Sequence, residues 1–369
     1  MLDRVLGGEP AEKALTNWGR ASRFAGSGDR AAIRDLVYEA LRCRSSLAAL
    51  GGGLTGRGLI LGLCRATGQE GLFDGQGHAP APPGPADMGR APEGAEALDM
   101  PDWLLPELQR SLGPDLVPVA QAMRSRAPVF VRVNTAKTDR DRAMALLASE
   151  GIASRPHPLA ETALELTENA RKLQVSQAYL SGQVELQDAS SQAVVQALPL
   201  VDGMRVLDHC AGGGGKALAM AARARLRILA HDIAPRRMAD LPDRARRAGA
   251  KVTLTDRPGE AGPYDLVLVD APCSGSGSWR RDPEGKWTLT RQGLDQLRAT
   301  QAGILDLVAP WVAPGGWLAY ATCSLLQAEN ADQAAAFLER HPGWAVQADH
   351  RFTPLQGGDG FYLALLRRP

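Results

Sequence analysis

The chain has 369 residues, 44% of them hydrophobic, and carries 42 Lys and Arg against 41 Asp and Glu. This length exceeds what one hydrophobic core usually supports, so two or three domains are expected. The formal charge of +1 does not by itself indicate a polyanionic partner, and no apolar run is long enough to cross a bilayer. The first residues lack the apolar core of a signal peptide, so we expect a cytoplasmic protein with no membrane-bound part.

Residues 1–74 are predicted to form a helical domain. The stretch "DRAAIRDLVYEALRCRSSLAAL" repeats apolar residues with the period of an α-helix, at Ile33, Leu36, Val37, Ala40 and Leu41. Residues 75–98 are rich in Pro, Gly and Ala and show no such period. That composition is typical of a linker or a mobile loop.

Residues 99–175 are predicted to form a small α/β module. Helical patterns at residues 102–113 and 139–151 flank the short strand pattern "VFVRVN" at residues 129–134, and extended pieces follow. Two strands and two helices are expected here.

Residues 176–369 alternate strand and helix patterns, which predicts an α/β domain with a doubly wound, mostly parallel sheet. The predicted strands are nearly continuous apolar runs, as in sheets covered on both faces: "MRVLDHC", "LRILAHD", "KVTLTD", "YDLVLVDAP", "GGWLAYATC" and "GFYLALLRR". Ligands of such sheets bind beyond the carboxyl ends of the strands, which is where we look for chemistry.

The first three of these strands end in features that suit a nucleoside cofactor. The first ends at Asp208 and runs into "HCAGGGGKA", where Gly212–Gly215 let the backbone approach a ligand closely. The spacing is neither that of a phosphate loop nor G-x-G-x-x-G, which disfavours a nicotinamide-dependent oxidoreductase. The second strand ends at Asp232, where a carboxylate can accept both hydroxyls of a ribose, and the third ends at Asp256, near an adenine.

The fourth and fifth strands each end at a cysteine. "DAPCSGSG" contains Asp270 and Cys273, and "ATCS" contains Cys323. If the two strands are neighbours, about 5 Å apart, both thiols open into one crevice beside the cofactor. A thiolate can attack C6 of a pyrimidine and make C5 accept a methyl group, and Asp270 is placed to act near N3 of the base.

The remaining cysteines have no such neighbours, and we interpret them as small buried apolar residues: Cys43, Cys64 and Cys210. The number of cysteines is odd and no C-x-x-C spacing occurs, so neither disulfides nor a metal site is expected.

At these residues the chain resembles the RsmB (Sun/Fmu) family of bacterial RNA 5-methylcytosine methyltransferases. The resemblance covers the last half of the chain through "LQDASSQAVV", "LDHCAGGGGK", "HDIAPRRM", "DLVLVDAPCSGSGSWRRDPEGKW", "YATCSLLQAENADQ" and "GFYLALLRR". "VFVRVNT" resembles the small RNA-binding module of this family, and "FAGSGDRAAIRDLVYEALR" resembles its N-terminal NusB-like RNA-binding domain, which is short in this chain.

The resemblance implies a Rossmann-like class I methyltransferase domain and a role for each site residue. Cys323 would attack C6 of the cytosine, Cys273 would help to eliminate the enzyme after methylation, and Asp270 would hold the base through N3 and N4. A flipped RNA base would be the target. S-adenosylmethionine would be the cofactor, bound by Ala211, Gly212, Gly213, Gly214, Gly215, Lys216, Asp232, Asp256 and Asp270.

The chain departs from the family pattern in the cofactor loop. Gly212 and Gly213 stand where the family usually has Ala-Pro, and Ala217 stands where it has Thr, so a looser loop is expected. RNA is the expected partner of a monomeric enzyme, with 16S rRNA favoured and tRNA left open. The rival classes are a DNA cytosine-5 methyltransferase, which would not need Cys323, and a non-catalytic RNA-binding protein, which would be expected to have lost a cysteine or Asp270.

Overall fold

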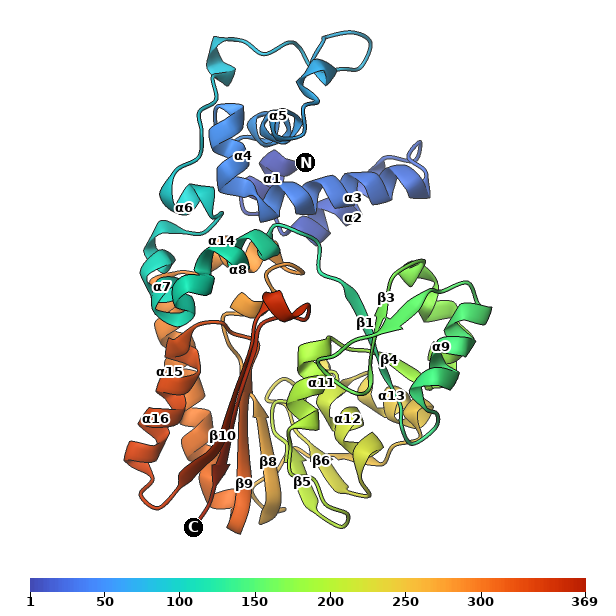
Figure 1. Cartoon of the computed structure of the whole chain (residues 1–369), viewed down its shortest axis with the longest axis vertical. Helices are drawn as coiled ribbons and strands as arrows, with labels where there is room; N and C mark the ends of the chain where they lie inside the picture. Colours follow the sequence, from blue (N-terminus) through green and yellow to red (C-terminus); the bar gives the residue numbers. More distant parts are fainter. The chain divides into compact units, whose positions relative to one another are not determined.

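A computed structural model describes residues 1–369, which divide into two units. One unit comprises Met1–Arg126 together with Trp279–Arg291, and the other comprises Ala127–Ser278 together with Gln292–Pro369. This division is coarser than the four segments expected from the sequence, whose boundaries stay a prediction. Figure 1 shows the elements of both units along the chain.

The first unit is entirely helical. Its α-helices are α1 (Leu2–Leu6), α2 (Ala11–Ala21), α3 (Ser27–Arg42), α4 (Arg44–Gly51), α5 (Gly56–Ala66), α6 (Gly94–Ala97), α7 (Leu105–Leu112), α8 (Leu116–Met123) and α14 (Pro283–Thr288). Short 3-10 helices are η1 (Glu70–Leu72), η2 (Pro85–Asp87), η3 (Asp102–Leu104) and η4 (Gly113–Asp115). The core collects apolar side chains of α1 to α5, including Val37, Ala40 and Leu41 from the predicted stripe of α3, whereas Leu36 is exposed.

Helices α4 and α5 meet at a corner that glycine makes possible. Their axes are bent by 88°. A side chain at Gly51 would overlap the carbonyl of Gly58, and one at Gly62 would overlap the carbonyl of Leu47, so the two helices approach backbone to backbone. No single helix is long and apolar enough to span a membrane, although α4 and α5 together pass by length and composition alone.

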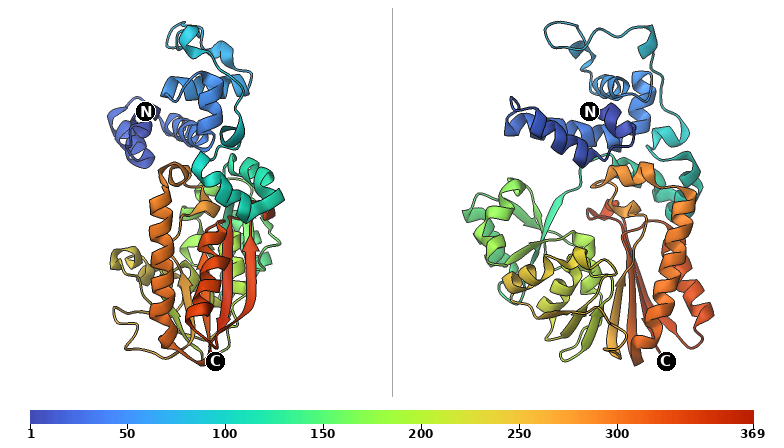
Figure 2. Two further views of the ribbon diagram at one scale, coloured as in Figure 1. Left: turned by 90° about the vertical axis from the view of Figure 1, so that its left-hand side faces the viewer. Right: turned by 180° about the vertical axis from the view of Figure 1, so that it is seen from behind.

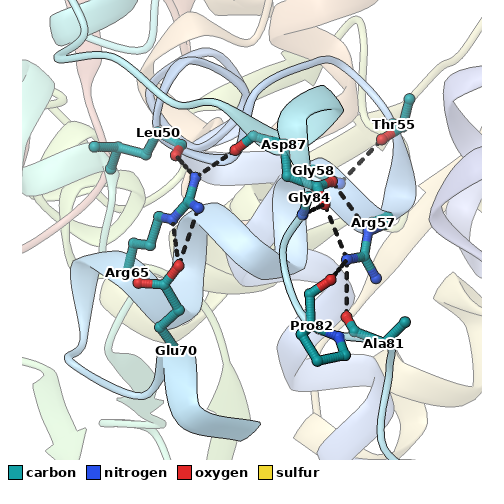
Figure 3. A network of polar contacts seen from close by, with 10 residues as sticks. All are labelled: Leu50, Thr55, Arg57, Gly58, Arg65, Glu70, Ala81, Pro82, Gly84 and Asp87. Carbon is teal, nitrogen blue, oxygen red and sulfur yellow. Dashed lines mark hydrogen bonds and ion pairs between the residues drawn. The ribbon is translucent and has the colours of Figure 1, made fainter. Parts of the chain in front are cut away.

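The Pro- and Gly-rich segment that the sequence predicts to be a linker is tied to α5 by two arginines (Figure 3). The guanidinium of Arg57 donates to the carboxylate of Asp87 at 3.0 Å and to the carbonyl of Ala81 at 2.9 Å. Arg65 donates to the carbonyl of Asp87 at 2.7 Å and pairs with Glu70. These bonds supply donors to backbone carbonyls of a segment that forms neither an α-helix nor a strand.

The second unit begins with a four-stranded antiparallel sheet, in the order β2-β3-β1-β4. Its strands are β1 (Val129–Val133), β2 (Ser154–Pro156), β3 (Ala163–Leu166) and β4 (Val184–Leu186). The helices nearby in the chain are α9 (Arg140–Ser149), η5 (Ala170–Val175), α10 (Gln177–Leu180) and α11 (Ala189–Gln196). The two strands of three residues are too short to leave a pattern, and β4 lies beyond residue 175, where the module was expected to end.

The larger sheet has seven strands in the order β10-β11-β9-β8-β5-β6-β7. They are β5 (Arg205–Asp208), β6 (Arg227–Ala230), β7 (Val252–Leu254), β8 (Tyr264–Asp270), β9 (Val312–Thr322), β10 (Ala345–Phe352) and β11 (Phe361–Arg367). The helices are α12 (Gly215–Arg223), α13 (Leu241–Ala248), α15 (Arg291–Val308) and α16 (Ala331–Arg340), with 3-10 helices η6 (Pro235–Met238), η7 (Ser276–Ser278), η8 (Ala309–Trp311), η9 (Gln327–Glu329) and η10 (Pro354–Gln356).

Helices cover both faces of this sheet, as the apolar strands predict. Successive residues of β8 alternate between the faces, with Val267 packed on the side of α15 and α16 and Leu268 on the side of α11 and α12. The long helix α15 runs beside the strands in both views of Figure 2. The fold prediction, a Rossmann-like doubly wound sheet, is therefore confirmed.

Two details differ from the sequence expectation. Strand β10 was missed because it is an edge strand with mostly exposed residues and carries no apolar run. It pairs antiparallel with β11, which itself pairs antiparallel with β9, so the sheet is parallel only from β9 to β7. The helical segment that the alternating pattern places between β6 and β7 is split into η6 and α13, and Pro242 stands in the first turn of α13.

Candidate active site

A glycine-rich loop connects β5 to α12 at the carboxyl edge of the larger sheet. Gly212 and Gly214 have φ angles of +50° and +75°, which residues with a side chain adopt at a cost. A Cβ at Gly214 would overlap the side chain of Leu241. The backbone N–H of Gly212 donates to the carboxylate of Asp232 at 3.0 Å. The loop is therefore held against β6 and α13 with its backbone open to the other side.

That open side is a cavity of about 540 Å³ beyond the ends of β5, β8 and β9. It is lined by eight of the residues predicted from the sequence: Ala211, Gly212, Gly213, Gly215, Lys216, Asp270, Cys273 and Cys323. Three predicted residues do not line it. Gly214 packs on Leu241, Asp232 lies behind Gly212, and Asp256 is an exposed residue after β7.

The two cysteines meet inside this cavity, because β8 and β9 are parallel neighbours in register at Asp270 and Ala321. Their Sγ atoms lie 3.4 Å apart, and both thiols are free. Either sulfur can donate the hydrogen bond between them. A hydrogen bond from Cys273 lowers the pKa of Cys323, while burial and the charge of Asp270 oppose this shift and the Lys216 ammonium supports it. The same hydrogen bond, together with burial, raises the pKa of Cys273. When Cys273 is the donor, Cys323 is the sulfur that carries the thiolate.

A buried carboxylate, Glu329 of η9, braces the loops that carry both cysteines. It accepts hydrogen bonds from the backbone N–H of Ser274 at 2.8 Å, from the hydroxyl of Ser274 at 2.5 Å and from the hydroxyl of Ser324 at 2.5 Å. The amide of Gln301 donates to it at 3.0 Å. Because Ser274 follows Cys273 and Ser324 follows Cys323, one side chain fixes the separation of the thiols. Sequence reasoning missed Glu329, although it lies six residues after Cys323.

Two carboxylates at strand ends differ sharply in their surroundings. Asp270 pairs with the ammonium of Lys216 at 2.5 Å. Burial alone would lower the pKa of Lys216, but the Asp270 carboxylate raises it, so the ammonium stays charged. No hydrogen bond of normal geometry reaches either oxygen of the fully buried Asp208, although the backbone N–H of Ala217 lies near enough to act against the rise of its pKa. Burial, followed by the charge of Asp270, raises the pKa of Asp208 to about 7. An unpartnered carboxylate lining the cavity suits a ligand with positive charge.

Two arginines that also line the cavity contact the glycine loop and its neighbour Asp232. Arg237 pairs with Asp232 at 3.1 Å, and Arg244 donates to the carbonyl of Gly213. A Cβ at Gly213 would come within 2.7 Å of the Arg244 guanidinium. Arg244 fills the space that a side chain at Gly213 would take. The loop therefore has a contact that the sequence-based expectation of a looser loop did not include.

No group of three or more His, Cys, Asp or Glu side chains in the chain is arranged to hold a metal ion. The glycine cradle and the unpartnered Asp208 together fit S-adenosylmethionine, whose amino acid part carries an ammonium and whose sulfur is positively charged. Residues of this chain alone form both the glycine cradle and the buried carboxylate.

Comparison with known proteins agrees with this geometry. Residues 195–367 match the family model described as 16S rRNA methyltransferase RsmB/F, and residues 100–172 match the ferredoxin-like domain of RsmF/B-like methyltransferases. Ribosomal RNA small subunit methyltransferase B of Citrobacter koseri is 35% identical over 282 residues, which are 72% of this chain. The chain covers 66% of the length of that relative, just short of two thirds.

Solved structures show the same fold. The structure of PH0851 covers the whole chain with a TM-score of 0.78 at 21% identity, and 96% of that protein is covered in turn. A methyltransferase homolog protein from Pyrococcus horikoshii covers 74% of this chain and is itself covered to 97%, with a TM-score of 0.65 at 24% identity. With the catalytic and ferredoxin-like models both matched in order, the chain belongs to the RsmB/F family of S-adenosylmethionine-dependent methyltransferases.

Proposed function

We propose that the protein transfers a methyl group from S-adenosylmethionine to C5 of a cytosine in RNA, through a covalent bond between Cys323 and C6 of the base. The observation that carries the proposal is the pair of thiols 3.4 Å apart in the cavity that the glycine loop lines. The name of the Citrobacter koseri relative favours small-subunit rRNA as the substrate. Transfer RNA is the alternative substrate.

Cys323 is the nucleophile in this proposal. Its thiolate is favoured by the hydrogen bond from Cys273 and by the charge of Lys216. Attack on C6 forms the S–C6 bond and moves the electron pair of the C5–C6 double bond toward C5, which becomes nucleophilic. S-adenosylmethionine, when bound, supplies a methyl group on a positively charged sulfur.

Asp270 is assigned to the base. Its carboxylate lies on the same cavity wall as the thiols and is held by Lys216. The carboxylate accepts a hydrogen bond from the N4 amino group, and from N3 once that nitrogen has taken up a proton, which offsets the electron density that the thiolate attack pushes into the ring. Lys216 keeps Asp270 oriented and also favours the thiolate, so this lysine serves both steps.

Cys273 is assigned to release. After methyl transfer the C5 proton must leave, and the electron pair of that C–H bond re-forms the C5–C6 double bond as the S–C6 bond breaks. Cys273 has lost the thiolate acceptor of its own proton once Cys323 is bonded to C6. Cys273 then releases its S–H proton to solvent, and the thiolate so formed takes the C5 proton as Cys323 leaves as a thiolate, which returns the pair to its starting state.

The cofactor set follows from the cradle. Ala211, Gly212, Gly213 and Gly215 offer backbone to the cofactor, and Asp208 is added to the residues predicted from the sequence as the partner of a positive charge. Asp232 would reach the ribose only by exchanging its bonds to Gly212 and Arg237. Gly214 acts through the geometry of the loop, and Asp256, an exposed residue after β7, is kept as the candidate for the adenine end of the cofactor.

Methyl transfer into RNA tests the proposal. Wild type, Cys323→Ala and Cys64→Ala are compared with labelled S-adenosylmethionine and either 16S rRNA or tRNA, and the modified nucleotide is identified by mass spectrometry. Cys64 is a buried thiol of the helical unit and serves as the matched control. We expect 5-methylcytidine from wild type and Cys64→Ala and none from Cys323→Ala. Another modified nucleotide, or activity in Cys323→Ala, would refute the mechanism, and inactive wild type with both RNAs would favour the binding-protein alternative.

A further inference from the structure

A second cavity, of about 210 Å³, lies apart from the thiols, between the small sheet and helices α11 and α12 of the same unit. Its floor is formed by buried residues, among them Arg132 of β1 and Gln192 of α11. Its rim is formed by exposed residues, among them Glu161, Gln196 and Arg223. Nothing in the proposed methyl transfer uses this cavity.

Arg132 at the floor is 3% exposed. The carboxylate of Glu185, opposite it on β4, acts on its charge but forms its ion pairs with Arg244 and Arg247. Its Nη1 donates to the side-chain oxygen of Gln187 at 2.5 Å and to the carbonyl of Gly215 at 2.9 Å. Its Nε has no hydrogen-bond partner. Burial lowers the pKa of Arg132 to about 10, which still leaves the guanidinium charged at neutral pH. A buried charged donor without an acceptor indicates a missing partner.

The other groups around the cavity add donors and little negative charge. Arg223 at the rim donates to the carbonyl of Val195 and also makes no ion pair. The side-chain oxygen of Gln196 accepts from the backbone N–H of Glu161 at 2.9 Å, so its amide nitrogen is left as a donor. Glu161 is the only carboxylate on the wall and is exposed. Among the lining residues, two guanidiniums stand against one carboxylate, and Glu185 beside Arg132 is shared with two further arginines, so the balance of charge around the cavity is positive.

We propose that this cavity is a binding site for a phosphate-type oxyanion, held by Arg132 and Arg223. Guanidinium groups bind such oxygens with paired, charge-assisted hydrogen bonds. The shared chemistry fits two sources, a phosphodiester of the RNA backbone or free inorganic phosphate. Only the RNA source rests on the proposed function.

An anion here would act on the cofactor loop through Arg132. The guanidinium that would bind the anion is the one that holds the carbonyl of Gly215, the first residue of α12. Gly215 lines the cofactor cavity. A phosphodiester in the second cavity would therefore fix RNA at a set distance from the thiols and steady the start of α12 at the same time.

The test measures binding by calorimetry, first with inorganic phosphate and then with a short single-stranded oligoribonucleotide. Three variants change the charge of the cavity. Gln196→Glu keeps the acceptor for the Glu161 N–H and adds a negative charge, Arg223→Gln removes a positive charge, and Glu161→Gln removes the negative charge without touching its backbone bond. Arg225→Gln is the matched control, since Arg225 lies two residues from Arg223 but pairs with Asp202 and lies outside the cavity.

Gln196→Glu and Arg223→Gln should weaken binding by about tenfold or more, Glu161→Gln should strengthen it, and Arg225→Gln should leave it unchanged. This pattern with phosphate identifies a site for the free anion, and the same pattern with the oligoribonucleotide alone identifies a phosphodiester site. Either supports the proposal. Binding that ignores all three cavity variants, or that falls equally in Arg225→Gln, overturns it. Calorimetry measures binding without methyl transfer, so a negative result here can be told apart from a failure of the proposed methylation. If Arg223→Gln does not fold, the Gln196→Glu variant alone decides between the outcomes.

Discussion

Replacing Glu329 by Gln should disturb the geometry of the two thiols without touching either of them. The carboxylate of Glu329 accepts four hydrogen bonds, from the N–H and hydroxyl of Ser274, the hydroxyl of Ser324 and the amide of Gln301. A glutamine has nearly the same shape. Its oxygen can keep the two N–H donors, and the two hydroxyls can turn to accept from its nitrogen.

The cost can be worked from these four bonds. A hydrogen bond to a charged group contributes about 1.5–3 kcal/mol, against about 0.5–1.5 kcal/mol for a neutral one, so each bond loses about 1 kcal/mol. Relief from burying a charge offsets part of this sum, which leaves a net loss of about 2 kcal/mol in the free energy of unfolding. For a unit of this size, that lowers Tm by about 4–8 °C.

Thermal unfolding and steady-state methylation measure the two consequences. Glu329→Gln should unfold earlier and show a lower kcat, with the KM for S-adenosylmethionine unchanged because the glycine loop is intact. Glu339→Gln, an exposed change on α16, is the control and should match wild type. Unchanged Tm together with unchanged kcat in Glu329→Gln would refute the bracing role.

Three further predictions concern the cofactor loop. As pH rises from about 4 to 7, wild type should lose about 4 kcal/mol of unfolding free energy relative to Asp208→Asn. The reason is that burial raises the pKa of Asp208 from 3.8 to about 7, so the folded state stays protonated after the unfolded state has ionised. Equal pH profiles of the two proteins in chemical denaturation would contradict the burial of an unpartnered carboxylate. Asp232→Ala should weaken cofactor binding by about 1–3 kcal/mol in calorimetry, since Gly212 loses its acceptor, and unchanged affinity would remove Asp232 from the site. Gly214→Ala should lower Tm more than Gly203→Ala, because both have positive φ but only Gly214 faces Leu241; equal losses would show that the overlap is relieved freely.

The positions of the candidate catalytic residues could be predicted from the sequence because the carboxyl ends of neighbouring parallel strands lie at one edge of the sheet. Asp270 and Cys273 come at the end of one apolar run, and Cys323 comes at the end of another. The pairing of β8 with β9 brings the two ends together. The glycine loop was visible for the same reason, since β5 ends directly before it. Residues at strand ends can be placed once the fold class is known.

What the sequence did not show depends on side chains that approach from other elements. Arg244 lies on α13 and contacts Gly213, and Arg132 lies on β1 and contacts Gly215, so neither is near its partner in the chain. Asp208 could be seen at a strand end, but its lack of a partner appears only when the surrounding side chains are in place. Strand β10 left no apolar pattern because it is an exposed edge.

A trapped covalent complex tests the central claim most directly. Cys273→Ala is mixed with 16S rRNA and S-adenosylmethionine and run on a denaturing gel beside wild type and the Cys273→Ala/Cys323→Ala double variant. Without Cys273 the adduct should accumulate as a slow, ribonuclease-sensitive band, and peptide mapping should place the nucleotide on Cys323. A band that persists in the double variant, or its absence while wild type methylates the same RNA, would contradict the roles assigned to the two thiols.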